Sequence, residues 1–211
     1  MSDQKPKSLL DASEYNSFEV KKLENSRFIN PYRVHFNHNE KKRIWDGIMY
    51  HASVSCIIYH TDKKSIILVR QFRPLVHVQQ VLEAQKIDLM KSNQSFESTK
   101  IDWSLVSPSE AFTFELCAGI CDKNKSLEET IQEEIHEECG FSVNLKDIHK
   151  ISAIRSGSLH TIFYTEVNES MKTGPGGGNP DEGECIELVE LPINKIREFI
   201  NDDSNPRAPG K

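Results

Sequence analysis

Residues 131–140, with the sequence IQEEIHEECG, carry four glutamates in two adjacent pairs. On a helix, with about 100° between successive residues, Glu134 and Glu138 fall within about 20° of Leu127 and border an apolar stripe. Two carboxylates in such a place repel each other unless a positive charge lies between them. Mg²⁺ meets this need, because it takes oxygen ligands and leaves places for water and phosphate oxygens. The pattern indicates a metal-binding helix that acts on phosphates, with a solvated acidic face as the alternative.

The element that must carry these glutamates has clear end signals. Ser126 and Glu129 have the spacing of a capping box, which predicts that the helix begins there. Gly140 stands where a left-handed glycine would end the helix near Cys139. Apolar residues recur at a spacing of four between these ends: Leu127, Ile131 and Ile135. The sequence therefore predicts one amphipathic helix over residues 126–139.

The rest of the chain is predicted to supply a sheet and a few short helices. A long connection from Val76 to Glu110 has room for a short helix, Pro192 opens another through about Ile200, and weak strand signals precede residue 46. Apolar, β-rich runs predict five strands: Ser53–His60, Ser65–Phe72, Phe112–Leu116, Thr161–Val167 and Glu184–Leu191. This mixture indicates an α+β fold, arranged as an α/β/α sandwich.

Composition narrows the classes of partner. The net charge of -6 and the pI near 5.8 give no overall attraction to nucleic acid or to an anionic membrane. About 18 consecutive apolar residues would be needed for a membrane-spanning helix, and the sequence has no such run. Five cysteines, most of them in apolar segments, fit reduced thiols packed as small hydrophobic residues. We therefore expect a cytoplasmic protein without nucleic-acid or membrane partners.

The glutamate helix and its flanks resemble a known motif. Residues 119–141, GICDKNKSLEETIQEEIHEECGF, resemble the Nudix box, with seven matches in register: Gly119, Glu134, Ile135, Glu137, Glu138, Gly140 and Phe141. The first glutamate of that motif is replaced by Lys125 and its arginine by Glu133. These two residues commonly form a bracing salt bridge in the family, and here their charges are exchanged. The resemblance implies a Nudix fold with a mixed β-sheet and a catalytic helix, in which Glu134 and Glu138 bind metal and Glu137 assists catalysis.

Two shorter segments extend the resemblance. Residues 115–119, ELCAG, are similar to the ELPAG sequence of ADP-sugar and ADP-ribose pyrophosphatases. This similarity implies that Ala118 gives its backbone oxygen to the metal and that Glu115 contacts substrate or metal. Residues 71–74, QFRP, are typical of the same subgroup, and they place Arg73 where a proline ends a strand. A guanidinium there could bind phosphate bidentately, although an exposed arginine is more often plain surface.

A later acidic loop completes the expected site. In related ADP-ribose hydrolases, one glutamate of this loop is the general base and another, two residues on, binds metal. By this resemblance, Glu182 is the base and Glu184 a metal ligand, and we expect the two to lie at the entry to a strand. The preceding GPGGG sequence at residues 174–178, too flexible for helix or strand on its glycine content, resembles the uridine diphosphate glucose pyrophosphatase group.

The resemblance as a whole implies hydrolysis of the pyrophosphate bond of a nucleoside diphosphate sugar with Mg²⁺, or with Mn²⁺ in its place. UDP-glucose would give UMP and glucose 1-phosphate. Two alternatives stay open: an ADP-ribose diphosphatase, and a non-catalytic ligand-binding protein with the Nudix fold. Residues 1–45 are expected to form an N-terminal arm of strands that helps build a homodimer. Residues 46–211 would be the Nudix domain, without the last C-terminal helix of its relatives.

Overall fold

The computed structural model describes residues 10–91, 95 and 98–207, and in this part of the chain a seven-stranded mixed sheet forms the centre. The hydrogen-bonded order is β5-β4-β3-β8-β7, while β6 pairs with β3 and β9 with β4. The strands are β3 (Ser53–His60), β4 (Ser65–Phe72), β5 (Phe112–Glu115), β6 (Cys117–Ile120), β7 (His149–Ser156), β8 (Ser158–Val167) and β9 (Ile186–Pro192). Only β3 and β8 run parallel, and the other pairs are antiparallel.

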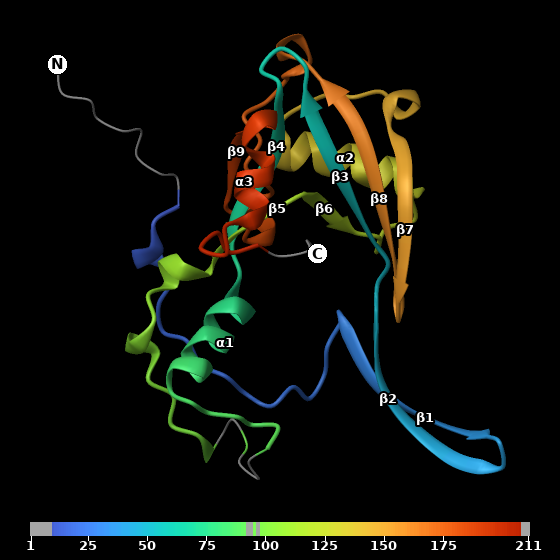
Figure 1. Ribbon diagram of the computed structural model, residues 1–211, viewed down its shortest axis with the longest axis vertical. Helices are drawn as coiled ribbons and strands as arrows, with labels where there is room; N and C mark the ends of the chain where they lie inside the picture. The colour runs from blue at the N-terminus through green and yellow to red at the C-terminus, as the bar shows by residue number, and fades with distance from the viewer. Residues whose placement is uncertain (1–9, 92–94, 96–97, 208–211) are drawn as a thin grey trace.

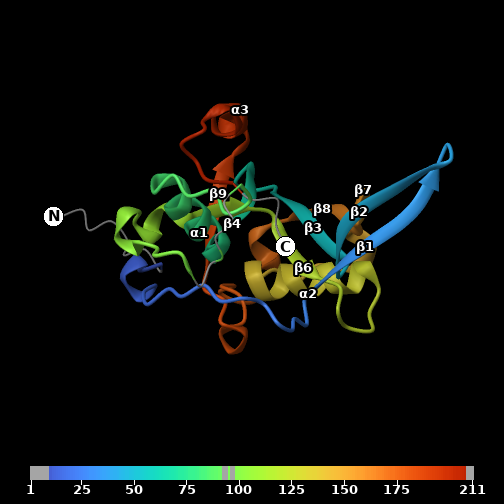
Figure 2. The same cartoon turned by 90° about the horizontal axis from the view of Figure 1, so that it is seen from below.

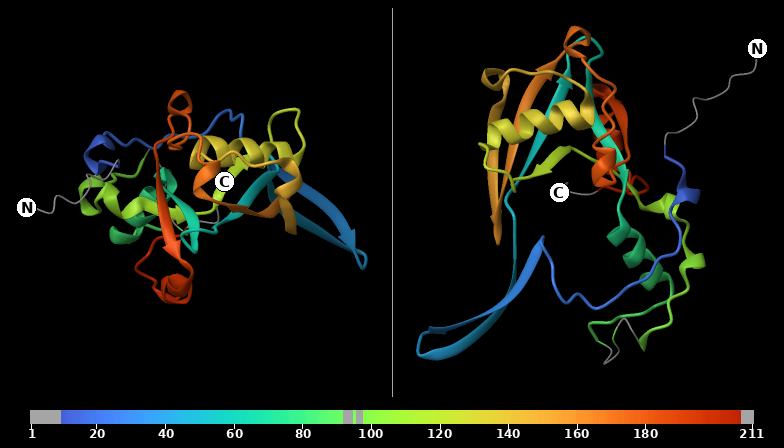
Figure 3. Two further views of the ribbon diagram at one scale, coloured as in Figure 1. Left: turned by 90° about the horizontal axis from the view of Figure 1, so that it is seen from above. Right: turned by 180° about the vertical axis from the view of Figure 1, so that it is seen from behind.

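The helix that carries the glutamates, α2 (Leu127–Cys139), lies across one face of this sheet (Figures 1 and 3). Ser126 and Glu129 form the expected capping box, and Gly140 ends the helix with a φ of 73°. The apolar side of α2 packs on β3, where Ile131, Ile135 and Cys56 are fully buried. Local capping signals and one apolar stripe thus fix both the ends and the facing of α2, as the sequence predicts.

The other helices are short or peripheral. Helix α1 (Pro74–Ala84) occupies the long connection after β4, and α3 (Ile196–Asn201) follows β9. Single 3₁₀ turns lie at Ala12–Glu14, Trp103–Leu105, Pro108–Ala111, Leu145–Asp147, Glu169–Met171, Pro180–Glu182 and Ile193–Lys195. Within the described residues, no helix is both long and apolar enough to cross a membrane.

The first two strands form a separate hairpin that projects away from the sheet (Figure 2). Strands β1 (Ile29–His38) and β2 (Lys41–Tyr50) pair along their whole length, yet almost every residue in them is exposed. Trp45 is 69% exposed and Met49 is 62% exposed. The weak N-terminal strand signals therefore correspond to a regular ribbon, whose apolar side chains are not covered by its own chain.

Strand β6 is not among the predicted strands, and β8 begins at Ser158, three residues earlier than predicted. Two further strand predictions need correction. The sequence analysis did not predict β7, because the register between β7 and β8 shifts between Lys150 and Ser152 and breaks the alternation of apolar residues. Strand β9 begins at Ile186, two residues later than predicted. Glu182 and Glu184 consequently lie before the strand and not at its first positions.

Candidate active site

Glu134 and Glu138 both reach from α2 to strand β6. Glu138 is only 1% exposed, and its Oε2 accepts a hydrogen bond of 3.1 Å from the backbone N–H of Ala118. The Glu134 carboxylate lies against Gly119, where an added β-carbon would overlap it. The glycine that opens the motif is therefore required sterically, because it lets a side chain of α2 cross the strand. The structure thus places Glu138 at Ala118 and Glu134 at Gly119, and the Ala118 atom that contacts Glu138 is the backbone nitrogen.

Glu137 lies on the outer side of α2 and is exposed. With His136 and the glycine-rich segment at residues 174–178, it lines an open hollow of about 410 Å³. Glu137 and Glu138 therefore have different surroundings, because Glu138 is buried against β6 and Glu137 is exposed. Helical spacing explains this separation, since Glu137 and Glu138 are turned about 100° from each other.

Arg73 and Glu115 pair with each other at the junction of β4 and β5. The Arg73 Nε and Nη2 atoms donate to the two carboxylate oxygens of Glu115 at 2.6 and 2.5 Å. Glu115 is 2% exposed and also accepts hydrogen bonds from Thr113 Oγ1 at 2.5 Å and Gln71 Nε2 at 3.4 Å. The sequence indicates Arg73 and Glu115 as separate contacts to substrate or, for Glu115, to metal. It gives no sign that Thr113 and Gln71 hold Glu115.

Arg73 lies within the electrostatic influence of Glu138 on α2 as well as of its partner Glu115. Burial acts to lower the pKa of Arg73, but it is outweighed by the hydrogen bonds and charge of Glu115, with further contributions from the charges of Glu138 and Glu184. The pKa of Arg73 consequently lies above its ordinary value. The three carboxylates come from β5, α2 and the loop before β9, so the fold collects residues about 70 positions apart around one cation.

The acidic loop before β9 is a 3₁₀ turn, Pro180–Glu182, followed by Gly183 in a left-handed conformation. Oε2 of Glu184 accepts a hydrogen bond of 3.1 Å from the backbone N–H of Asn179. The backbone of Glu182 lies in the turn, but its side chain is outside the described part of the structure. Because Glu182 and Glu184 both precede β9, the alternation of side chains between the two faces of a strand does not apply to them.

The glycine-rich segment at residues 174–178 is ordered by contacts to α2. Gly177 N–H donates to the carbonyl of Glu138 at 2.9 Å, and Gly178 N–H donates to that of Glu137 at 3.1 Å. Lys172 adds a hydrogen bond of 2.8 Å from Nζ to the carbonyl of Cys139. The segment is neither helix nor strand, as predicted, but it caps the C-terminal end of α2. The glycine content of the segment predicts its backbone freedom, but it does not predict that the segment binds the end of α2.

The donors at β6 and α2 suit a hard divalent cation. Two carboxylates lie there, those of Glu134 and Glu138, and the resemblance adds the backbone carbonyl of Ala118 as an expected ligand. Such oxygen ligands are those that Mg²⁺ and Mn²⁺ accept. Among the described residues, no three acidic, histidine or cysteine side chains converge into a complete metal site. Two carboxylates and one carbonyl would fill only part of the coordination shell of such an ion, and water and phosphate oxygens would take the remaining positions.

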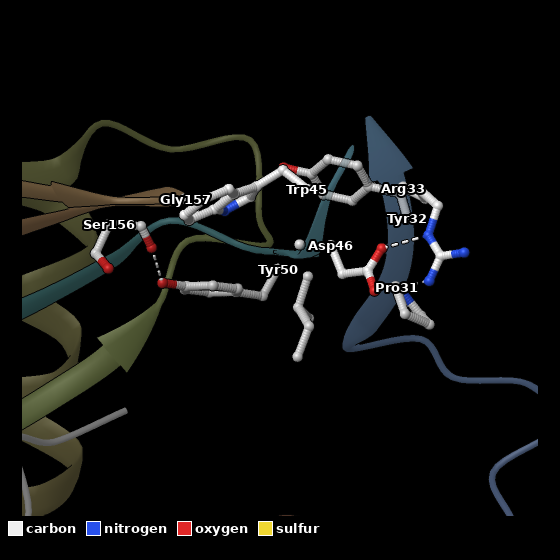
Figure 4. Close-up of a pocket in the computed structure, with 10 residues that line it drawn as sticks. Pro31, Tyr32, Arg33, Trp45, Asp46, Tyr50, Ser156 and Gly157 are labelled. Atoms are coloured by element: carbon white, nitrogen blue, oxygen red, sulfur yellow. Dashed lines mark hydrogen bonds and ion pairs between the residues drawn. The ribbon is translucent and has the colours of Figure 1, made fainter. Parts of the chain in front are cut away.

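A larger hollow lies elsewhere, between the hairpin and the end of β7 (Figure 4). It has a volume of about 980 Å³ and is bordered by Trp45, Tyr50 and the ion pair of Arg33 with Asp46. Tyr50 Oη donates to the carbonyl of Ser156 at 2.5 Å, which fixes the hairpin against β7. None of the site residues predicted from the sequence lines this hollow.

Lys125 and Glu133 form the salt bridge that their exchanged charges suggest. Both side chains are nearly two-fifths exposed, so we expect a coupling energy of about 0.5 kcal/mol. Unfolding of Lys125→Ala, Glu133→Ala and the double variant in denaturant measures this energy. Full additivity of the two substitutions would show that the pair does not brace the loop against α2.

Comparisons with known proteins find relatives by sequence and by fold. No family model matches the chain. The chain is 33% identical over 191 residues to uridine diphosphate glucose pyrophosphatase NUDT14 of Bos taurus, covering 88% of this chain and 85% of that protein. It is 29% identical over 147 residues to GDP-mannose pyrophosphatase of Escherichia coli (strain K12), covering 68% and 61% of the two chains.

Solved structures support the same fold. The crystal structure of an ADP compounds hydrolase aligns with a TM-score of 0.56 and 15% identity, covering 87% of this chain and 81% of that one. At this identity the likeness concerns the fold alone, which confirms the predicted α+β architecture with a mixed sheet. The extensive match to NUDT14 carries the assignment further. The chain belongs to the Nudix hydrolases, in the family of the uridine diphosphate glucose pyrophosphatases.

Proposed function

We propose that this protein hydrolyses the pyrophosphate bond of nucleoside diphosphate sugars, with UDP-glucose as its preferred substrate. The products are UMP and glucose 1-phosphate. The observation that carries the proposal is the placement of Glu134 and Glu138 at Ala118 and Gly119, with the part-buried Arg73 in the electrostatic neighbourhood of Glu138. Names of the relatives support the substrate class, since they include pyrophosphatases of uridine diphosphate glucose and of GDP-mannose.

In this proposal, the carboxylates of Glu134, Glu138 and Glu184 and the carbonyl of Ala118 hold Mg²⁺, with Mn²⁺ as a substitute. When bound, such an ion would neutralise charge on the phosphates and lower the pKa of a water molecule bound to it. Glu137 assists from the outer side of α2, and Glu182 accepts the proton of the attacking water.

Arg73 is proposed to bind a phosphate of the substrate through a donor fork preorganised by Glu115. Glu115 occupies two donors of the guanidinium, Nε and one on Nη2. A guanidinium has five N–H donors, so others remain for a phosphate oxygen. Glu115 therefore acts through the orientation of Arg73, and it contributes the negative charge that stabilises this part-buried cation.

The deciding experiment measures phosphomonoester release from UDP-glucose, GDP-mannose and ADP-ribose in parallel, each with and without Mg²⁺. We expect metal-dependent turnover, with the largest kcat/KM for UDP-glucose. A larger kcat/KM for ADP-ribose would favour the ADP-ribose diphosphatase alternative. Absence of turnover with all three, for a folded protein that binds them, would support a ligand-binding role.

We further propose that the protein is a homodimer joined through the hairpin β1–β2. Tyr32, Val34, Phe36, Trp45 and Met49 share one face of the hairpin by strand alternation, and each is more than 40% exposed. An apolar surface of this kind on a regular ribbon fits an interface between subunits.

Sedimentation velocity tests the dimer. The wild type should sediment as twice 24.1 kDa, and Trp45→Lys should shift it toward the monomer, because a charge replaces an apolar anchor. Leu75→Lys is the control, since Leu75 is 83% exposed on α1, away from the hairpin. A wild type that sediments at 24.1 kDa at every concentration would contradict the proposal.

The cysteines support a cytoplasmic location, which is also part of the proposal. Cys56, Cys117 and Cys139 are buried as free thiols, and burial raises the pKa of the Cys56 thiol above its ordinary value. Thiols kept protonated in this way are unreactive core residues. Five free cysteines fit a reducing compartment better than an oxidising one.

A further inference from the structure

The end of α2 and the loop that carries Glu184 are separate elements, and the glycine-rich segment at residues 174–178 lies between them. We propose that Gly178 and Asn179 are positioning residues, which hold the Glu184 carboxylate at a fixed place relative to the end of α2. This inference rests on the proposed function, because it takes Glu184 and Glu138 as ligands of one site. It adds residues that the Nudix motif does not contain.

The glycine-rich segment is attached to α2 by two backbone hydrogen bonds. The N–H groups of Gly177 and Gly178 donate to the carbonyls of Glu138 and Glu137, the residues that carry the second glutamate pair. A β-carbon on Gly176 would lie 2.5 Å from the carbonyl oxygen of Glu138. The backbones are therefore so close that a side chain at position 176 would push the end of α2 away.

The glycine-rich segment and Asn179, the residue after it, also contact Glu184. Gly178 has a φ of 81°, and an added β-carbon would lie 2.8 Å from Cβ and 2.9 Å from Oε2 of Glu184. The N–H of Asn179 donates to Oε2 of Glu184 at 3.1 Å, and the N–H of Glu184 donates to the carbonyl of Asn179 at 3.1 Å. Glu184 is thus held at both its backbone and its carboxylate by one neighbouring residue.

The two attachments share Gly178. Its N–H is bonded to α2, and its missing side chain leaves the space that Glu184 occupies. Ile186 N–H donates to the carbonyl of Gly177 at 3.1 Å, so the start of β9 is tied to the same segment. A shift at position 178 would therefore change the distance between two carboxylates of the site without altering either of them.

The test is Gly178→Ala, which adds one methyl group against Glu184. Gly157→Ala is the control for backbone strain, because Gly157 has a φ of 82° and its nearest contact to an added β-carbon is 3.6 Å. Gly174→Ala is the control for the segment itself, because an added β-carbon there has no described neighbour within 4 Å. Circular dichroism and thermal melting establish that each variant folds.

Two readouts are compared: the Kd for Mn²⁺ without substrate, measured by electron paramagnetic resonance, and kcat with UDP-glucose. Gly178→Ala should raise the Kd by about tenfold or more and lower kcat, as expected for residues that orient metal ligands. Gly157→Ala should lower the melting temperature to a similar extent but leave the Kd at the wild-type value. Gly174→Ala should match the wild type in both.

The outcomes separate this inference from the proposed function. A wild type that turns over UDP-glucose, with a Gly178→Ala variant of unchanged Kd and kcat, would refute the inference and leave the function standing. A Kd raised in Gly178→Ala, with no turnover of any nucleotide sugar by the wild type, would support the positioning role and refute the proposed function. Gly176→Ala provides a second check, since it presses on α2 and should also raise the Kd.

Discussion

Glu138→Gln is expected to lower kcat with UDP-glucose by at least about 100-fold, because it removes a buried negative charge where phosphate charge must be neutralised. The amide keeps the size of the side chain, and its oxygen can still accept the hydrogen bond from the backbone N–H of Ala118. The fold should therefore survive. The melting temperature should be equal to that of the wild type or higher, since a buried carboxylate costs desolvation energy.

Glu128→Gln is the matched control for this prediction, because it makes the same chemical change in the first turn of the same helix. Its kcat should stay close to that of the wild type. Turnover assays of both variants, each over a range of Mg²⁺ concentrations, give the comparison. Equal activity of Glu138→Gln and Glu128→Gln would remove Glu138 from the site and leave its burial as a matter of packing alone.

The second large effect is expected for Arg73→Ala. This substitution leaves the Glu115 carboxylate buried without its main partner, and breaking a buried pair costs about 3 kcal/mol of unfolding free energy. It should also raise KM for UDP-glucose if Arg73 binds phosphate. Arg73→Lys should be more stable than Arg73→Ala, but its KM should remain well above that of the wild type, because an ammonium group lacks the planar donor fork.

Arg70→Ala serves as the control for the effect on KM. Arg70 precedes Arg73 by three residues, but it pairs with Glu187 and packs on Phe114 on the other face of the sheet. Its replacement should leave KM unchanged. If Arg73→Ala lowers stability but KM stays constant, Arg73 is a structural partner of Glu115 and does not contact the substrate.

The parts of the fold that the sequence predicts well are those with local causes. The ends of α2 follow from Ser126, Glu129 and Gly140, which lie within the helix or next to it. The edge position of Glu138 follows from helical spacing relative to Leu127. Both inferences need only the geometry of a helix, so neighbouring residues contain the required information.

The remaining features depend on contacts between distant residues. The pairing of Arg73 with Glu115 requires β4 beside β5, and the order of the glycine-rich segment requires the end of α2 beside it. Glycines at positive φ indicate freedom in the chain, whereas the hydrogen bonds that remove this freedom come from another element. Strand β7 was missed because a bulge at Ile151 disturbs its alternation.

The parallel pairing of β3 with β8 also has a consequence for how the protein is made. Ser53 on β3 contacts His160 on β8, which lies 107 residues later in the chain. During synthesis at about 5 to 20 residues per second, β3 must wait several seconds or longer for this partner to leave the ribosome. The backbone edge of β3 that β8 later occupies stays unpaired during that interval, because contacts of such long range form late. Nascent chains should therefore depend on chaperones until β8 has emerged.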